Sequence, residues 1–260
     1  MSESSRISFV GSGNVAWHLA PALENCGYAV SEVFSPNPKN AESLVRRLYN
    51  GRRKKNLDFS NSASDIFILS ISDDAIEGIS KEIVLPENAV LLHTSGAVSM
   101  EILSFSAASQ LGVFYPIQTF SKGQKIDFRN IPILIESTNK STRKLLKNMA
   151  KGLSNNVVYA SSEDRKLIHV AAVFASNFTN HMLTRSKDIL GTKGYDFEIL
   201  KPLVAEMINK SLTKGPENAQ TGPAKRHDFR TIESHQEVFD DDSLKEIYRL
   251  ISQDIIDHYS

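Results

Sequence analysis

A glycine-rich segment directly after the first apolar run is the feature that most constrains the fold of this chain. Residues 7–10 read as a strand, and the sequence GSGNVA at residues 11–16 then opens a helical pattern. This order matches a dinucleotide-binding fingerprint in which alanine takes the place of the third glycine. Gly11 would allow the sharp turn, Gly13 would let backbone approach a pyrophosphate, and Ala16 would let helix and strand pack closely.

The start of that helix also supplies free N–H donors and partial positive charge, which suit a phosphate. The alternative is a tight turn between strand and helix in an α/β fold that binds no nucleotide. On the nucleotide-binding hypothesis, the cofactor contacts Gly11, Ser12, Gly13, Asn14 and Val15.

Short apolar or β-branched runs alternate with amphipathic segments through the first 160 residues. Strands are predicted at residues 7–10, 29–34, 65–72, 89–94, 112–115, 131–135 and 156–160. Helices are predicted between most of them, at residues 14–26, 40–48, 75–83, 99–107 and 141–153. This alternation is typical of an α/β fold with a doubly wound, Rossmann-like parallel sheet, in which a ligand binds at the carboxyl ends of the strands.

The strand signals stop after residue 160, and the rest of the chain reads as helix. We therefore expect a dinucleotide-binding domain over residues 1–160 and an all-α domain over residues 161–260. A long helix is predicted from a cap at Ser161 to Gly191. Further helices are predicted at residues 197–212 and 244–258, with a long loop at 215–239 and a solvated loop at the charge run 52–55.

Within the long helix, residues 167–178 are apolar on nearly every side. A single buried stripe cannot account for this pattern, so other helices or a second subunit must cover it. We therefore predict a homodimer that forms through the helical domain.

Composition narrows the classes of function. The 30 Lys and Arg residues balance 30 Asp and Glu residues, so no bulk charge attracts nucleic acid or anionic lipid. The single cysteine, Cys26, cannot form an internal disulfide, and the histidines lack metal-ligand spacing. No apolar run approaches the roughly 18 residues of a membrane span, and no signal-peptide pattern precedes the first strand. These observations predict a cytoplasmic protein that binds no metal, nucleic acid or membrane.

The end of the second predicted strand indicates the cofactor. A domain selective for NAD usually places Asp or Glu about 20 residues past the fingerprint. Here residues 34–39 read Phe-Ser-Pro-Asn-Pro-Lys, without an acid. Ser35 and Lys39 are therefore predicted to bind the 2′-phosphate of NADP, the alternative for Lys39 being simple solvation.

Three further strand ends carry polar groups, at residues 70–74, 93–96 and 115–118. Because the carboxyl ends of parallel strands meet at one edge, these groups could line a shared crevice. We predict cofactor contacts from Ser72, Asp73, Thr94 and Ser95, and a substrate contact from Gln118. Asp73 could equally cap a helix, and His93 could be a hydrogen-bonded residue at a strand end.

Polar side chains interrupt the apolar long helix. His169 and Ser176 fall on nearly one face, and Asn177 on a neighbouring face. A hydride-transfer enzyme needs a proton donor, and histidine suits that role at neutral pH. His169 is predicted to be catalytic, Asn177 to orient the substrate and Ser176 to contact it. The alternative is that all three are structural polar contacts.

The segment at residues 221–228 offers a handle for an anionic substrate. Arg226 presents a planar cation suited to a carboxylate or phosphate, and Asp228 stands beside it. The alternative is that Arg226 pairs with Asp228 and only shapes the loop.

Six motifs, taken in order, resemble one family of two-domain proteins: GSGNVAWHLAPAL, DIFILSISDDAI, HTSGA, YPIQTF, HVAAVFASNF and GPENAQTGPAKRHD. Its members join an N-terminal Rossmann-like NADP-binding domain to a C-terminal helical domain of unknown function. The family is similar to pyrroline-5-carboxylate reductase, deazaflavin-dependent NADP reductase and the 6-phosphogluconate dehydrogenase group. The resemblance implies an NADP oxidoreductase that dimerises through the helical domain and binds substrate between the domains.

Two positions depart from the family pattern. Tyr115 stands where histidine often precedes Pro116, and its hydroxyl could still donate a proton, while His227 stands where glycine is common. The Lys-x-x-x-Asn pair of the related hydroxyacid dehydrogenases is absent, because Lys166 is followed four residues later by Val170. That chemistry therefore cannot be carried over.

The sequence favours an NADP-dependent oxidoreductase that transfers a hydride between NADP(H) and a small carbonyl, hydroxyl or imine substrate. Tyr115, His169 and Asn177 are the candidate catalytic residues. The competing hypothesis is a non-catalytic NADP(H)-binding sensor or scaffold.

Overall fold

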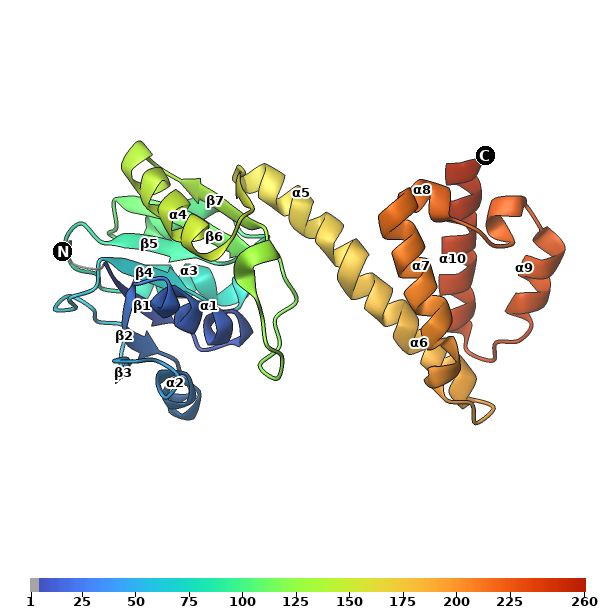
Figure 1. The fold of residues 1–260 in the computed structure, drawn as a ribbon, viewed down its shortest axis with the longest axis horizontal. Coiled ribbons are helices and arrows are strands. Elements are labelled where there is room, and N and C mark those ends of the chain that lie inside the picture. The colour runs from blue at the N-terminus through green and yellow to red at the C-terminus, as the bar shows by residue number, and fades with distance from the viewer. Residues whose placement is uncertain (1–4) are drawn as a thin grey trace. The chain divides into compact units, whose positions relative to one another are not determined.

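The computed structural model describes residues 5–260, and the chain forms two compact units, Met1–His181 and Met182–Ser260. An eight-stranded sheet organises the first unit (Figure 1). The strands are β1 (Arg6–Val10), β2 (Ala29–Phe34), β3 (Arg52–Lys54), β4 (Ile66–Leu69), β5 (Val90–His93), β6 (Gln110–Pro116), β7 (Ile133–Ser137) and β8 (Val157–Tyr159). The main helices between them are α1 (Asn14–Asn25), α2 (Pro38–Val45), α3 (Asp73–Glu82) and α4 (Lys140–Leu153).

The strand order is β3-β2-β1-β4-β5-β6-β7-β8, and every neighbouring pair is parallel except β6 and β7. The first six strands follow the Rossmann order, which confirms the predicted α/β class. β7 runs antiparallel to β6 because the segment between them, with only the short 3-10 helix η2 (Phe128–Asn130), does not carry the chain back across the sheet. The order reverses between β1 and β4, which is where such sheets bind ligands.

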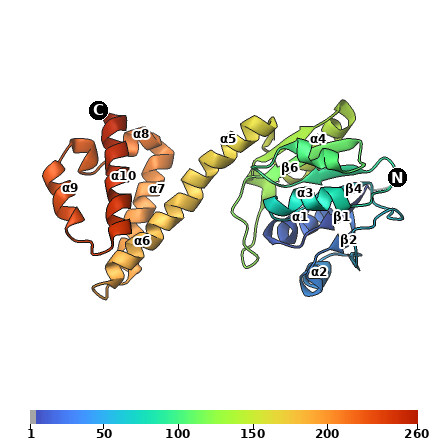
Figure 2. The ribbon, with the colours of Figure 1, turned by 180° about the vertical axis from the view of Figure 1, so that it is seen from behind.

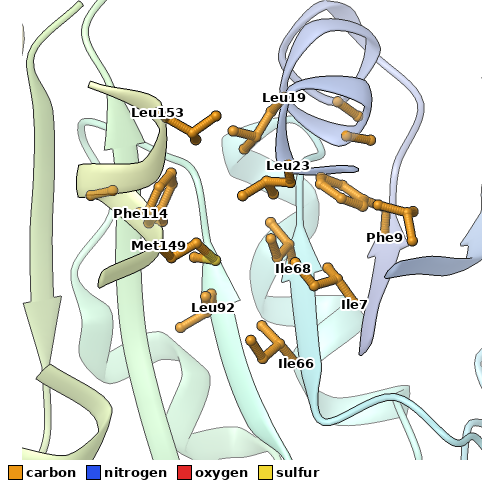
Figure 3. Close-up of a cluster of buried hydrophobic side chains, with 14 of the residues drawn as sticks. Ile7, Phe9, Leu19, Leu23, Ile66, Ile68, Leu92, Phe114, Met149 and Leu153 are labelled. Carbon is orange, nitrogen blue, oxygen red and sulfur yellow. The ribbon is translucent and has the colours of Figure 1, made fainter. Parts of the chain in front are cut away.

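Both faces of the sheet are covered, and the central strands β4 and β5 are accordingly buried along their whole length. One core packs α1, α2 and α4 against side chains such as Ile66 and Ile68, and Figure 3 shows Leu23 and Met149 among them. The other packs α3 against Phe67 and its neighbours, on the side seen in Figure 2. Successive residues of one strand point to opposite faces, which accounts for the division.

The predicted loop at residues 52–55 is wrong, because this charge run contains β3. Glu32 on β2 is buried and pairs with Arg52 at 3.0 Å and Lys54 at 3.9 Å. Burial alone would raise the pKa of Glu32, but hydrogen bonds from Ser62 and Arg52 outweigh burial and hold the pKa below its ordinary value. These charged residues therefore belong to an edge strand and pair with Glu32, rather than lying in a solvent-exposed loop.

The helix predicted at residues 99–107 is instead the short 3-10 helix η1 (Met100–Phe105). The long helix is confirmed as α5 (Ser162–Ala172), a π-helical segment η3 (Val173–Phe178) and α6 (Thr179–Gly191). The Ser161 side chain caps α5 by accepting from the Asp164 N–H. The expected domain boundary, between residues 160 and 161, falls where strands give way to helices. That residues 1–160 bind the dinucleotide and residues 161–260 form a separate domain stays a prediction.

The second unit is helical. Beyond the rest of α6 it contains η4 (Phe197–Leu200), α7 (Lys201–Lys214), α8 (Pro216–Ala219), η5 (Ala224–Arg226), α9 (Phe229–Gln236) and α10 (Asp242–Tyr259). The long loop predicted at residues 215–239 is wrong, because α8, η5 and α9 occupy much of it, and η5 and α9 pack on α10. Within residues 5–260, no helix has the length and apolar character needed to cross a membrane.

Candidate functional site

A cleft of about 720 Å³ opens at the carboxyl ends of the parallel strands in the first unit. Its walls come from the segments that follow β1, β2, β4, β5 and β6, from the end of β6 and from His169 on α5. This is the edge at which the strand order reverses, so the cleft lies where an open α/β sheet binds its ligand.

The predicted fingerprint forms the floor of this cleft, where Gly11, Ser12, Gly13, Asn14 and Val15 all line it. Gly11 has a φ of +109°, and a Cβ there would lie 2.0 Å from the Ser70 carbonyl oxygen. Only glycine can make this turn. Gly13 is the N-cap of α1. A Cβ there would meet no atom nearer than 4.0 Å, so a side chain at this position would project into open space.

The first turn of α1 thus faces the cleft with backbone N–H groups that no side chain of its N-cap residue, Gly13, can satisfy. Such donors, with the positive end of the helix dipole, bind phosphate. The open space at Gly13 is what a pyrophosphate lying against the backbone requires. These residues therefore fit a dinucleotide.

The end of β2 supplies a wall without a carboxylate. Ser35 lines the cleft as predicted, together with Asn40, whereas Lys39 is exposed and is not among the lining residues. Asn37 caps α2 by accepting from the Lys39 N–H at 3.0 Å. Among residues 5–260, Asp73 is the one carboxylate in the lining.

The polar strand ends meet as expected: Ser72, Asp73, Thr94 and Ser95 all line the cleft. Ser72 is the N-cap of α3, and Asp73 lies in its first turn, where a carboxylate favours the helix dipole. The Ser95 hydroxyl accepts from the N–H groups of Ala97 and Val98 and thereby shapes its own loop.

Tyr115 and His169 face each other at the end of the cleft formed by β6 and α5. The Tyr115 hydroxyl lies 2.9 Å from His169 Nδ1, and either group can donate. Gly96 makes room for them, because a Cβ there would lie 2.6 Å from both His169 Nδ1 and Tyr115 Cζ. Two of the three predicted catalytic residues therefore form a hydrogen-bonded pair at the cleft.

Tyr115 is half-buried and holds its proton at neutral pH. Burial and the nearby Asp73 carboxylate raise the pKa of Tyr115 above its ordinary value, and the positive charge of Arg165 offsets only part of this. The hydroxyl can therefore give a proton to a neighbouring group.

Arg165, which the sequence reasoning missed, holds α5 against the sheet. Its side chain is 1% exposed and donates to the Glu136 carboxylate, the Val98 carbonyl and the Ser162 hydroxyl. His169 follows Arg165 by one helical turn, so this buried anchor determines where the imidazole lies. Its spacing of four residues from His169 was the available signal, but Arg165 lies in a polar first turn beside Asp164 and Lys166 and does not stand out there.

His93 is a structural residue outside the cleft lining. It is fully buried, and its Nδ1 accepts from the Ser95 N–H at 3.1 Å. Burial, together with the charge of Arg165, lowers the pKa of His93 to about 3, so the ring is neutral. This geometry favours the hydrogen-bonded alternative considered for His93.

Several predicted site residues lie outside the cleft lining. Gln118 is exposed and accepts from the Thr119 N–H, while Ser176 and Asn177 lie in the π-helical segment η3. In the second unit Asp228 caps α9, and hydrogen bonds from Thr231 lower its pKa. Arg226 is exposed in the same segment. The substrate roles of these residues stay predictions.

The lining also includes groups that were not predicted, among them Gly96, Asn40, Ser70 and Lys122. Gly96 and Ser70 belong to polar strand ends that were identified without being given a role. Lys122 lies in a segment that has neither helical nor strand periodicity, so no sequence signal placed it at the cleft.

Comparison with known proteins finds two family models that match successive parts of the chain. Residues 6–95 match a family model described as NADP oxidoreductase, coenzyme F420-dependent, and residues 131–255 match a domain of unknown function, DUF2520. No match was found among curated proteins.

Solved structures resemble the whole chain. A Bacteroides fragilis protein assigned as an NADP oxidoreductase is 35% identical, with a TM-score of 0.88 over 98% of this chain and 99% of its own. A Thermotoga maritima protein is 23% identical, with a TM-score of 0.75 over 96% and 99%. An Aspergillus terreus reductive aminase in complex with NADPH is 12% identical, with a TM-score of 0.69 over 98% and 94%, which shows a shared fold.

Proposed function

Because the chain belongs to the family of NADP oxidoreductases that carry a C-terminal DUF2520 domain, we propose that it reduces or oxidises a small carbonyl, hydroxyl or imine substrate at the cleft. NADP is the cofactor of this family. The observation that carries the proposal is the Tyr115–His169 pair, which lines the same cleft as the fingerprint.

The residues around the cleft divide into a binding end and a reacting end. The first turn of α1 would hold the pyrophosphate, and Ser35 would meet the 2′-phosphate where an NAD-selective domain carries an acid. Ser72, Thr94 and Ser95 would lie along the nicotinamide half. We therefore expect NADPH to bind more tightly than NADH.

Reduction of a carbonyl or imine requires one hydride and one proton. NADPH, held by the first turn of α1, would supply the hydride. Tyr115, which is protonated at neutral pH, donates its proton to the substrate oxygen or nitrogen. His169 Nδ1–H can donate to the Tyr115 oxygen across their 2.9 Å hydrogen bond, which leaves the Tyr115 O–H free to point to the substrate. The tyrosinate left after the transfer recovers its proton from solvent.

The test is a screen of small carbonyl and imine compounds that follows NADPH absorbance. Tyr115→Phe and His169→Ala should each lower turnover by about 10²–10⁴-fold, the usual contribution of a positioned acid, and leave the Kd for NADPH unchanged. Turnover that is unaffected by both substitutions would contradict the assignment.

The chain offers a matched control. In the second unit, His235 Nδ1 lies 2.8 Å from the Tyr248 hydroxyl, in a pair of nearly the same geometry. His235→Ala and Tyr248→Phe should leave turnover unchanged. If NADPH binds but no carbonyl or imine is reduced, the non-catalytic sensor becomes the better description.

We further propose that the chain acts as a homodimer in which the apolar face of α5 and η3 is covered. Leu167 is 71% exposed and Phe174 is 65% exposed, and both lie in the segment that reads as apolar on nearly every side. Obligate interfaces bury more than about 2,000 Å², and light scattering should report a dimer at micromolar concentration. A stable monomer would contradict the proposed homodimer and would leave the proposed activity unaffected.

We expect Arg226 to bind a carboxylate or phosphate group of the substrate. The cytoplasmic location expected from composition is a separate prediction. Arg226→Lys should weaken binding of an anionic substrate and leave the Kd for NADPH unchanged, because a lysine cannot reproduce the bidentate hydrogen bonds of the guanidinium.

A further inference from the structure

The segment between β6 and η2, residues 117–127, is tied to the start of α1. We call it the strap. His18 on α1 is 8% exposed, and its Nε2–H donates to the Ser121 carbonyl at 2.9 Å. The Phe120 ring stacks on the His18 ring with centroids 5.7 Å apart, and Phe120 also meets Phe128, at 5.9 Å. A partly buried hydrogen bond and two ring contacts thus fix the middle of the strap.

Lys122 follows these anchors directly and is brought to the cleft by them. Its ammonium lies 5.0 Å from the centroid of the Trp17 ring, and Trp17 is in the first turn of α1, next to the fingerprint. Lys122 also lines the cleft. Within residues 5–260, it is the one lysine or arginine in that lining, while the predicted Lys39 is not part of it.

A dinucleotide brings a negatively charged pyrophosphate to this place. The first turn of α1 offers backbone N–H groups, which the helix dipole supports with only about half an elementary charge. A full positive charge beside that turn would complete the neutralisation. The flexible four-carbon stem of lysine lets the ammonium move from the Trp17 ring to a phosphate oxygen.

Resting on the proposed cofactor site, we propose that Lys122 binds the pyrophosphate of the bound dinucleotide and that the strap positions it there. The contact serves a group that NADH and NADPH share, so Lys122 contributes affinity without selecting between them. Selection belongs to the end of β2, at Ser35. The alternative is that Lys122 only covers the Trp17 ring, an exposed cation–π contact.

The test measures nucleotide affinity, with no substrate needed. Trp17 is the single tryptophan of the chain and lies beside Lys122, so its fluorescence reports binding directly. Lys122→Gln should raise the Kd for NADH and for NADPH by the same factor, about 10-fold or more, as expected for loss of a charged hydrogen bond. Lys122→Arg should restore most of the affinity, and Lys122→Gln should also flatten the salt dependence of Kd.

The control is Lys125→Gln, an exposed lysine on the same strap that does not line the cleft, and it should leave both Kd values unchanged. Unchanged affinity in Lys122→Gln would overturn the proposal. A loss confined to NADPH would also overturn it, since it would place Lys122 at the 2′-phosphate. Wild-type protein that binds neither nucleotide would overturn the proposed function itself, a separate result.

Discussion

The buried ring of His93 makes the stability of the protein depend on pH in a way that can be calculated. The pKa of His93 is lowered from 6.5 to about 3, first by burial and then by the charge of Arg165. Between these values the unfolded chain binds a proton that the folded protein does not. The stabilisation is therefore complete above pH 6.5 and is lost progressively as the pH falls toward 3.

Each pH unit in this window costs about 1.4 kcal/mol per proton. Lowering the pH from 6.5 to 5 should therefore reduce the free energy of unfolding by about 2 kcal/mol through His93 alone, a large share of the roughly 5–15 kcal/mol of a typical protein. Urea unfolding at pH 7.5, 6 and 5 measures this directly.

The comparison variant is His93→Gln, which has no ionisable group at this position. The carboxylates titrate alike in both proteins, so the difference between the two pH profiles isolates His93. We expect the difference in the free energy of unfolding between wild type and variant to narrow by about 2 kcal/mol from pH 6.5 to 5. Parallel profiles would refute the burial argument.

Three further substitutions test the site. Gly13→Val should abolish binding of NADPH and NADH in a folded protein, because the side chain would fill the open space at the cleft floor. Normal binding would show that the glycine-rich segment is only a tight turn. Gly96→Ala should push Tyr115 and His169 apart and lower turnover by about 10²-fold at constant Kd for NADPH, whereas Gly123→Ala, with nothing within 4 Å, should have no effect. Arg165→Met should destabilise by about 3–5 kcal/mol, because Glu136 loses a buried partner, whereas Arg249→Met in the exposed pair with Glu246 should leave the urea midpoint unchanged.

Much of the fold follows from local patterns in the sequence. All seven predicted strands are present, because short runs rich in apolar and β-branched residues are typical of strands in a sheet covered on both faces. β3 escaped prediction because its residues are cations. They pair with β2 through the backbone, and the buried carboxylate of Glu32, 20 residues before Arg52, offsets the charges of Arg52 and Lys54. No local pattern reveals such a partner.

The candidate site, like the fold, contains residues that the sequence could identify and residues that it could not. The fingerprint residues could be identified because turn, strand and helix are contiguous in the chain. Tyr115 and His169 were singled out separately, but their pairing joins positions 54 residues apart and depends on the anchor at Arg165. Lys122 and Gly96 could not be predicted, since each acquires its place only from the folded neighbours around it.

A crystal structure of the protein with NADPH would show directly whether the cleft holds the cofactor beside Tyr115 and His169. We expect the pyrophosphate against Gly13 and the 2′-phosphate beside Ser35. Tyr115 or His169 should lie within about 4 Å of the nicotinamide carbon that carries the hydride, the range of a near-attack geometry. A nicotinamide ring that turns away from Tyr115 and His169, or a nucleotide bound outside this cleft, would contradict these expectations.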